Sequence, residues 1–428
     1  MRFWLMMFVA VAWHAPAVAE PELRGHGGPV RAIAITPDGQ RAITGSFDQS
    51  AIVWQLDRGI ALAVLRVHEG AVNAVAALPG GRFATAGEDG RIALWAGTGA
   101  SAPERLLNVH KGPISALALS PDGHWIASSS WDSTVWLTPL GGGESRAFEG
   151  HPGNINGVAF SPDGHALISA GYDGTLRIWP LDGTAPRVVR LPTPLNALAV
   201  ARDGTIAAGG ADGSLFLLSG TGALRQQIEA AESPLIAVAF SPDGRTVAAA
   251  SPRGAVVFFD TATGEKRFTL NGPGLPVWSL AFTPDGRQLL TGGGDRIVRR
   301  WDALNGEHLG PVVIERGVDF SAGLDGSRGA EVFKACAVCH ALKAGEAPRA
   351  GPSLAGVMGR HIGTTPGYAY SGGFAAHDIV WSKETIARLF ELGPSTYTPG
   401  TKMPEQKVIS AEDRAALVDF IEKATRQP

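Results

Sequence analysis

The chain has 428 residues, too many for one ordinary compact core, so two domains or a large repeat fold are expected. Its composition, 45% hydrophobic and 18% charged, excludes a largely disordered protein. The formal net charge of −3 gives no electrostatic reason to expect nucleic acid as a partner.

The first residues have the organisation of an export signal. Arg2 precedes a nearly unbroken apolar run over residues 3–13, and Ala17-Val18-Ala19 follows the small-x-small pattern of a cleavage site. A retained membrane anchor is the alternative, but the run is shorter than the roughly 20 apolar residues that span a bilayer. We therefore expect residues 1–19 to be a signal peptide and the mature chain to begin at Glu20. It would then have no membrane span and, in a bacterium, would be periplasmic.

Seven repeats occupy residues 20–315. Each contains a Ser/Thr-Pro-Asp-Gly turn or a degenerate copy of it, and the glycine content of 56 residues agrees with many tight turns. The proline or its counterpart stands at positions 37, 79, 121, 162, 202, 242 and 284, in steps of 40 to 42 residues. Seven such units predict an all-β, seven-bladed propeller with four strands in each blade.

The first unit illustrates the prediction. Strand-like runs cover residues 30–35, 41–46, 51–56 and 60–66, and a polar turn at 47–50 separates the second run from the third. Proline at the start and glycine at the end of the turns suit the backbone angles that such turns require.

The repeats resemble the WD-repeat family in three recurring positions. The matching histidines are His26, His68, His110 and His151; the matching turn aspartates are Asp48, Asp89, Asp173 and Asp295; the matching tryptophans are Trp54, Trp95, Trp179 and Trp301. The resemblance implies that histidine, aspartate and tryptophan form a buried hydrogen-bonded network in each blade. Thr138, Leu218 and Phe259 replace the tryptophan, and Arg253 replaces one aspartate, so those blades are expected to depend more on packing.

The sequence leaves the closure of the ring undecided and indicates a structural rather than a catalytic propeller. We expect residues 21–24 to form the outer strand that closes the ring, with residues 308–314 as the competing segment, and the sequence does not decide between them. Histidines at equivalent places in different blades favour a structural role over a metal site. No nucleophile motif, phosphate loop or carboxylate cluster is present, so we interpret the propeller as a docking scaffold by analogy.

A Cys-x-x-Cys-His motif follows the propeller. Residues 316–328 have the composition of a linker and 329–335 are helical in pattern, and then comes the motif Cys336-Ala337-Val338-Cys339-His340. This motif is the attachment signature of c-type haem: two thiols add to the vinyl groups, and the histidine ligates iron. A redox dithiol is the alternative, but it does not need the histidine.

The last hundred residues resemble class I cytochromes c of the mitochondrial and bacterial electron-carrier type. The resemblance rests on residues 351–360, 367–371, Trp381 and 397–403, and on a closing helix at 411–424. It implies an all-α domain over residues 329–428. It also implies that Leu417 and Phe420 of the closing helix pack on Gly329 and Phe333 of the first helix.

The same resemblance implies the site residues of one covalent haem. Cys336 and Cys339 would attach it, with His340 as proximal and Met403 as distal iron ligand. The Pro352 carbonyl would accept a hydrogen bond from the His340 ring. Arg360, Tyr370, Trp381 and Thr401 would bind or neutralise the propionates. Three other residues compete with Met403: Met358, expected in the core, and His361 and His377, expected at the surface.

These features together predict an exported electron-transfer protein whose propeller docks it to a redox partner protein, which also meets the haem edge. His/Met ligation leaves no open iron position, as electron transfer requires. Basic and acidic residues balance from Asp319 onward, so electrostatic steering by this domain would be modest. The alternatives are a periplasmic haem enzyme with a second cofactor or substrate site in the propeller, and a haem-based sensor with an exchangeable ligand.

Overall fold

The computed structural model describes most of the chain. The described residues are 22–100, 102–271, 275–309, 325–337, 340–345, 351–366, 368, 370, 377–398, 408 and 410–426. The predicted signal peptide, residues 1–19, and residues 316–324 of the predicted linker lie outside these ranges. Within them, no helix combines the length and the apolarity needed to cross a bilayer.

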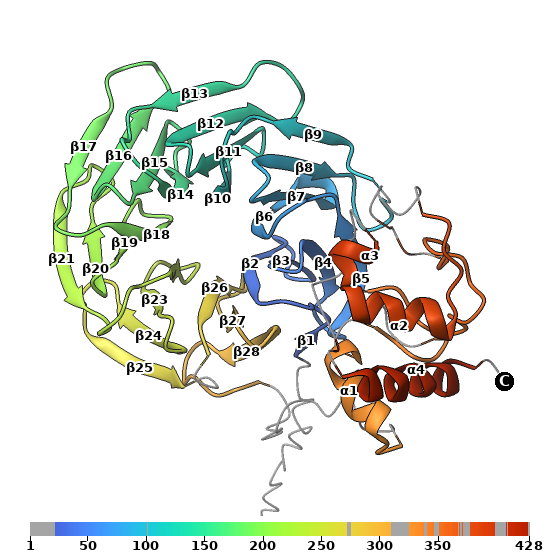
Figure 1. Ribbon diagram of the computed structural model, residues 1–428. Coiled ribbons are helices and arrows are strands. Elements are labelled where there is room, and N and C mark those ends of the chain that lie inside the picture. The colour runs from blue at the N-terminus through green and yellow to red at the C-terminus, as the bar shows by residue number, and fades with distance from the viewer. Residues whose placement is uncertain are drawn as a thin grey trace, which may run out of the picture.

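Seven four-stranded antiparallel sheets stand in a ring, as Figure 1 shows, which confirms the predicted propeller. Blades 1 to 3 are β2–β5 (Val30–Ile35, Arg41–Ser46, Ser50–Gln55, Ile60–Arg66), β6–β9 (Val72–Leu78, Arg82–Gly87, Arg91–Trp95, Arg105–Asn108) and β10–β13 (Ile114–Leu119, Trp125–Ser130, Thr134–Pro139, Arg146–Glu149). Blades 4 to 6 are β14–β17 (Ile155–Phe160, Ala166–Gly171, Thr175–Pro180, Arg187–Arg190), β18–β21 (Leu195–Val200, Ile206–Gly210, Ser214–Leu218, Leu224–Glu229) and β22–β25 (Ala237–Phe240, Thr246–Ala250, Ala255–Asp260, Lys266–Asn271). Blade 7 joins β26–β28 (Val277–Phe282, Gln288–Gly293, Ile297–Asp302) to β1 (Leu23–Arg24).

The hydrophobic core lies between neighbouring blades. One cluster joins Ile43 and Val53 of blade 1 to Val72 and Phe83 of blade 2, and all four side chains are buried. Each blade has only short strands, so it buries its apolar faces mainly by packing on the next blade. The degenerate turn of blade 2, Pro79–Gly81, forms the short 3-10 helix η1.

The N-terminal segment supplies the outer strand that closes the ring. Leu23 pairs with Val298 and Arg24 with Ile297 at the edge of β28. His308, from the competing segment, forms an isolated bridge with Trp301 farther along the same edge. Leu23, Arg24 and His308 therefore all lie at this edge, and the segment from the chain start forms the strand, while residues 310–314 lie outside the described residues.

A chain of hydrogen bonds locks blade 1. The Nδ1 atom of His26 lies 3.0 Å from an Asp48 carboxylate oxygen, which can only accept, so Nδ1 carries the proton. The Nε2 atom then accepts from the Thr44 hydroxyl at 2.7 Å, and the same hydroxyl oxygen accepts from Trp54 Nε1 at 2.8 Å. Burial alone would raise the pKa of Asp48, but His26, together with Arg66 and Ser50, holds that pKa well below its usual range.

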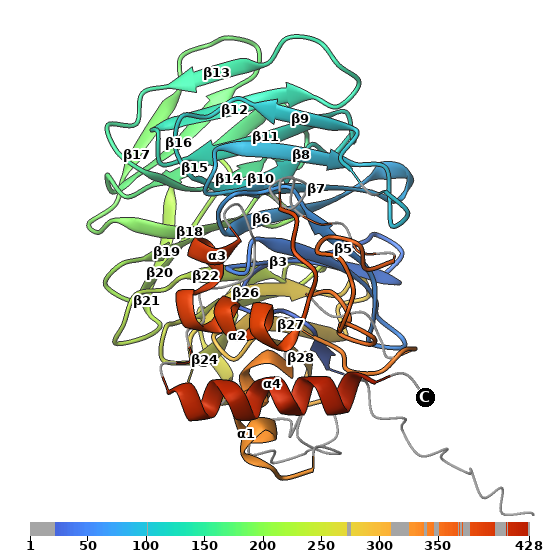
Figure 2. The same cartoon turned by 45° about the vertical axis from the view of Figure 1, so that its right-hand side comes forward.

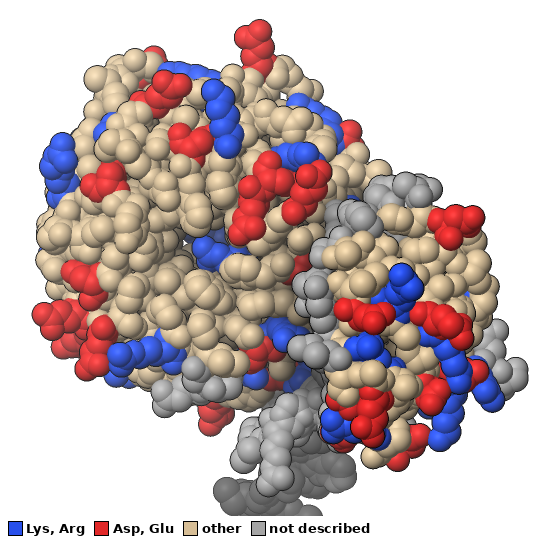
Figure 3. Space-filling model, viewed as in Figure 1, with Lys and Arg blue, Asp and Glu red and all other residues tan. Residues whose placement is uncertain are grey.

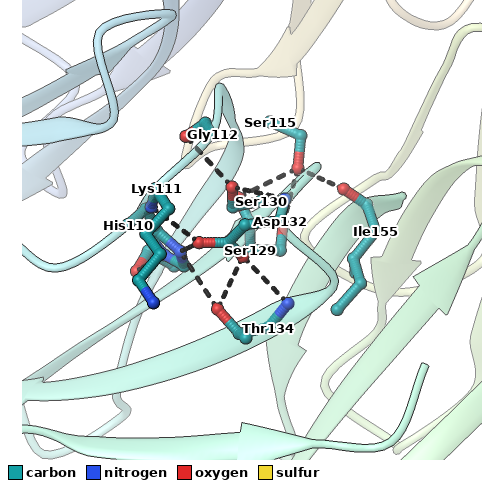
Figure 4. A network of polar contacts seen from close by, with 10 residues as sticks. His110, Lys111, Gly112, Ser115, Ser129, Ser130, Asp132, Thr134 and Ile155 are labelled. Atoms are coloured by element: carbon teal, nitrogen blue, oxygen red, sulfur yellow. Dashed lines mark hydrogen bonds and ion pairs between the residues drawn. The ribbon is translucent and has the colours of Figure 1, made fainter. Parts of the chain in front are cut away.

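The network predicted from the WD-repeat resemblance varies among blades. Blades 2 and 4 repeat it with Thr85 and Ser169 as the bridging hydroxyls. Blade 3, drawn in Figure 4, keeps the contacts of His110 with Asp132 and Ser128, but Thr138 stands where the tryptophan would be. In blade 7, Trp301 donates to Thr291.

The C-terminal part is helical. Its helices are α1 (Arg328–Ala337), α2 (Lys383–Leu392), α3 (Pro394–Tyr397) and α4 (Ala411–Thr425). Helices α1 and α4 approach so closely at Gly329 that a Cβ atom there would overlap the Ala416 carbonyl oxygen. The Phe333 and Phe420 rings lie 5.3 Å apart, and Leu417 is fully buried in the same cluster. The predicted packing of the closing helix on the first helix is confirmed.

The helical part lies beside blade 1 of the propeller, as the views in Figures 1 and 2 agree. The Arg66 guanidinium, on the outer strand β5, sits 5.2 Å from the centre of the Tyr368 ring. Tyr368 in turn packs edge-on against Tyr370 at 4.8 Å. This cation–π contact joins the two parts of the chain at a defined place.

Candidate functional site

The end of helix α1 positions the first cysteine and the histidine of the motif. Cys336 is buried in the helical core, and the His340 N–H donates to the Cys336 carbonyl at 3.0 Å. That bond brings the backbone of His340 next to the last turn of helix α1. Cys339 lies outside the described residues.

The His340 ring is oriented by the backbone of the following loop. Its Nδ1 atom lies 2.8 Å from the Pro352 carbonyl oxygen, which can only accept, so Nδ1 carries the proton. The ring lone pair is then on Nε2, the atom that a proximal iron ligand uses. The Leu354 N–H donates to the Ala341 carbonyl at 2.8 Å and holds the loop against the motif.

The helical core offers apolar surface for a cofactor. The helical core has partly buried side chains at its margin, among them Leu354, Met358, Trp381 and Tyr397. A porphyrin ring needs such an apolar surface, and Cys336 at the end of helix α1 and the oriented His340 ring would attach the group and ligate its iron. The described residues therefore fit a c-type haem.

Arg360 and Trp381 are brought together by their backbones. The Trp381 N–H donates to the Arg360 carbonyl at 3.0 Å, directly before helix α2. The Arg360 guanidinium donates to the carbonyls of Ser353 at 2.7 Å and Ala355 at 2.9 Å. Burial lowers the pKa of Arg360, and the neighbouring Tyr370 opposes that effect.

Tyr370 belongs to the same region, since its hydroxyl donates to Thr365 at 2.6 Å. The predicted roles of Arg360, Tyr370 and Trp381 toward propionates stay predictions. Thr401 and the predicted distal ligand Met403 lie outside the described residues.

The competing ligands occupy other places. Met358 packs against the helical core, and His361 is exposed, with Nε2 2.7 Å from an Asp378 carboxylate oxygen. Both therefore stand where the sequence analysis expected them. His377 is half-buried. Met403 stays the predicted distal ligand.

Three residues that hold this region in place were not predicted from the sequence. The carbonyls of Ser353 and Ala355, which hold Arg360, are backbone atoms and have no side-chain signature. Arg66 lies about three hundred positions from its partner Tyr368, and no local pattern links them. The sequence contains no signal that would have identified either contact.

Comparison with known proteins divides the chain into the same two parts. The profile described as WD domain, G-beta repeat, matches residues 19–55, 59–96, 101–137, 142–180 and 264–302, and the Cytochrome c profile matches residues 326–425. Residues 181–263, with Leu218 and Phe259 in place of the blade tryptophan, lie outside these matches.

Several curated proteins are similar to the C-terminal part. Cytochrome c from Stellaria longipes is 39% identical over 103 residues, which are 24% of this chain and 94% of that protein. Cytochrome c from Arabidopsis thaliana is 39% identical over 109 residues, 25% of this chain and 96% of that protein. Cytochrome c from Cochliobolus lunatus is 40% identical over 103 residues, with shares of 24% and 94%.

Proposed function

Since the chain belongs to the cytochrome c family through its last hundred residues and has a WD-repeat propeller before them, we propose that it carries single electrons to or from a partner protein docked on the propeller. The electrons would pass through one haem attached covalently to Cys336 and Cys339. The observation that supports this best is the contact of His340 Nδ1 with the Pro352 carbonyl, which orients the ring as a proximal ligand.

The surrounding residues would each have a defined part. When bound, the haem supplies a one-electron couple. His340 would ligate the iron through Nε2 and Met403 would be the second protein ligand, so that the two residues together would exclude small molecules. Arg360, held by two carbonyls, keeps a positive charge in a partly buried place and balances acidic groups of the cofactor.

The propeller would supply the selectivity of docking. Figure 3 shows basic and acidic side chains mixed over the helical part and scattered over the visible propeller face. Such a surface gives little long-range steering, so a second contact area raises the local concentration of the partner. The Arg66–Tyr368 contact supports this proposal, since it ties the haem region to the scaffold.

The location is part of the same proposal. Cleavage after Ala19 would release the chain on the far side of the membrane, where covalent haem attachment in bacteria would occur. Sequencing the N-terminus of the mature protein from a periplasmic fraction tests this. A chain that begins at Glu20 supports export; one that retains Met1 contradicts it.

The absorption spectrum of the reduced, matured protein, before and after carbon monoxide is added, tests the carrier function. We expect an unchanged six-coordinate c-type spectrum, and a carbon monoxide shift in Met403→Ala. Met358→Leu is the matched control and should behave as the parent, because Met358 is not the predicted ligand and packs against the helical core. A shift in the parent protein would favour the sensor or enzyme alternatives. A haem assay by pyridine haemochrome should find one haem per chain, and a second chromophore would favour the enzyme.

A further inference from the structure

Polar side chains link the inner strands of neighbouring blades around the central channel. At the second position of three inner strands, Asn73, Ser115 and Asn156 each donate to the first carbonyl of the next blade, at 3.1, 2.6 and 2.9 Å. Figure 4 shows the bond from Ser115 to Ile155. In these three blades the residue at the second position stabilises the ring by a hydrogen bond to the next blade.

Arg31, at the same position of blade 1, is used differently. Its guanidinium makes no hydrogen bond or ion pair with any residue that the structure describes; instead it lies over the Trp278 ring, 5.3 Å from the centre. Trp278 occupies the second position in blade 7 and packs against Phe47 with centroids 6.1 Å apart. The indole thus holds the cation at the mouth of the channel, and Phe47 supports the indole.

The surroundings leave the Arg31 charge only partly compensated. Burial lowers the pKa of Arg31, and the Glu88 carboxylate opposes that effect from beyond ion-pair distance. Glu88 itself accepts a hydrogen bond from the Ala71 N–H at 3.2 Å. A half-buried guanidinium without an acceptor is unfavourable, and an anion that reaches its donors would offset the cost.

Aromatic side chains surround this mouth. Phe47, Trp131 and Tyr172 each directly precede the turn aspartate of their blade and are 42%, 48% and 56% exposed. The register Val30↔Ser46 places these turns at the same edge of the blade as the start of the inner strand. Trp131 is fixed by a bond from Nε1 to Asn156 at 3.1 Å. Rigid aromatic groups that stay in water are typical of protein-binding surfaces.

We propose that Arg31 binds the carboxylate of an acidic side chain on a partner protein, and that apolar neighbours of that side chain pack on Phe47 and Trp278. A guanidinium pairs with a planar carboxylate through two parallel hydrogen bonds. The nearby Glu88 carboxylate repels a doubly charged phosphate more strongly than it repels a singly charged carboxylate. Figure 3 shows a narrow opening at the centre of the ring, with basic side-chain atoms beside it. The inference rests on the proposed docking role of the propeller.

The first test observes Arg31 directly. The full-length haem protein is labelled with 15N-arginine and titrated with sodium propionate or uncharged propionamide, and the Nε–Hε signals are followed by NMR. The Arg31 signal is assigned by its loss in Arg31→Lys. We expect a saturable shift of this signal with propionate and none with propionamide. Arg253 is the control, because it is exposed at the turn-aspartate position of blade 6 and already pairs with Glu232 at 3.5 Å. Equal or non-saturable shifts of both signals would mean an adventitious ion only.

The second test separates a protein partner from a free carboxylate. Acetyl-Leu-Glu-Leu-amide should bind at least tenfold more tightly than propionate, and its glutamine counterpart should bind at least tenfold more weakly. Phe47→Ala should remove the tenfold gain and leave the propionate affinity unchanged. A peptide no tighter than propionate would overturn the protein-docking proposal. These readouts do not depend on the carbon monoxide spectrum, so either proposal can fail alone.

Discussion

The hydroxyl of Thr44 joins two buried groups of blade 1, so its removal should be unusually costly. It lies 2.7 Å from His26 Nε2 and 2.8 Å from Trp54 Nε1. Thr44→Val conserves the side-chain volume, so no cavity forms, but both nitrogens lose their partner. Leaving one buried polar group unsatisfied costs about 1–3 kcal/mol. The predicted decrease in the free energy of unfolding is therefore about 2–6 kcal/mol.

Blade 3 provides a matched control for this prediction. Ser128 is the equivalent hydroxyl, but it serves His110 alone, because Thr138 replaces the tryptophan. Ser128→Ala should therefore cost about 1–3 kcal/mol, roughly half as much. Both variants are compared with the parent by urea unfolding followed by far-ultraviolet circular dichroism, with equal slopes required. Equal losses in the two variants, or a loss below about 1 kcal/mol in Thr44→Val, would refute the reasoning.

Three further predictions concern acid, helix packing and ring closure. Burial lowers the pKa of His110 and His151, so the unfolded chain takes up protons before the folded protein does as the pH falls below about 6.5. The free energy of unfolding should therefore decrease by up to about 1.4 kcal/mol per pH unit for each ring. Urea unfolding at a series of pH values measures this, and a stability that increases as the pH falls would contradict it. Gly329→Ala should lower the midpoint of thermal haem-domain unfolding by several degrees, because the added methyl meets the Ala416 carbonyl; an unchanged Soret melting curve would refute it. Leu23→Ala should cost the propeller about 2–4 kcal/mol in urea, and no loss would mean that β1 contributes nothing to closure.

Much of the fold was predictable because its signals are local. Four consecutive residues determine the conformation of each Pro-Asp-Gly turn, and Gly39 has the expected positive φ of 68°. The number of these turns therefore predicts the number of blades. The motif Cys336 to His340 is equally local, and the Pro352 contact followed from its family resemblance. The blades lacking tryptophan kept the four-stranded sheet, since strand pairing and packing between blades do not depend on that ring.

Other features depended on pairings that no local pattern encodes. Residues 21–24 were the favoured candidate for the closing strand and residues 308–314 competed with them, because both segments are short and can be extended. Only the position of β28 in three dimensions distinguishes them. In sequence, Arg31 does not differ from the polar residues at the equivalent position of other blades. Its contact with the Trp278 ring exists only in the folded structure.

The pairing of β1 with β28 also governs the order in which the propeller can mature. Leu23 is among the first residues of the ring and its partner Val298 among the last, so closure is a contact of very long sequence separation. As the chain folds from its start, six blades can assemble one after another, while the edge of β28 is not yet formed. Once formed, that edge is an unpaired strand until the chain start returns to it, and unpaired edges recruit other chains. The pairing of β1 with β28 should therefore be the slow step of folding, and the risk of aggregation should be greatest just before it.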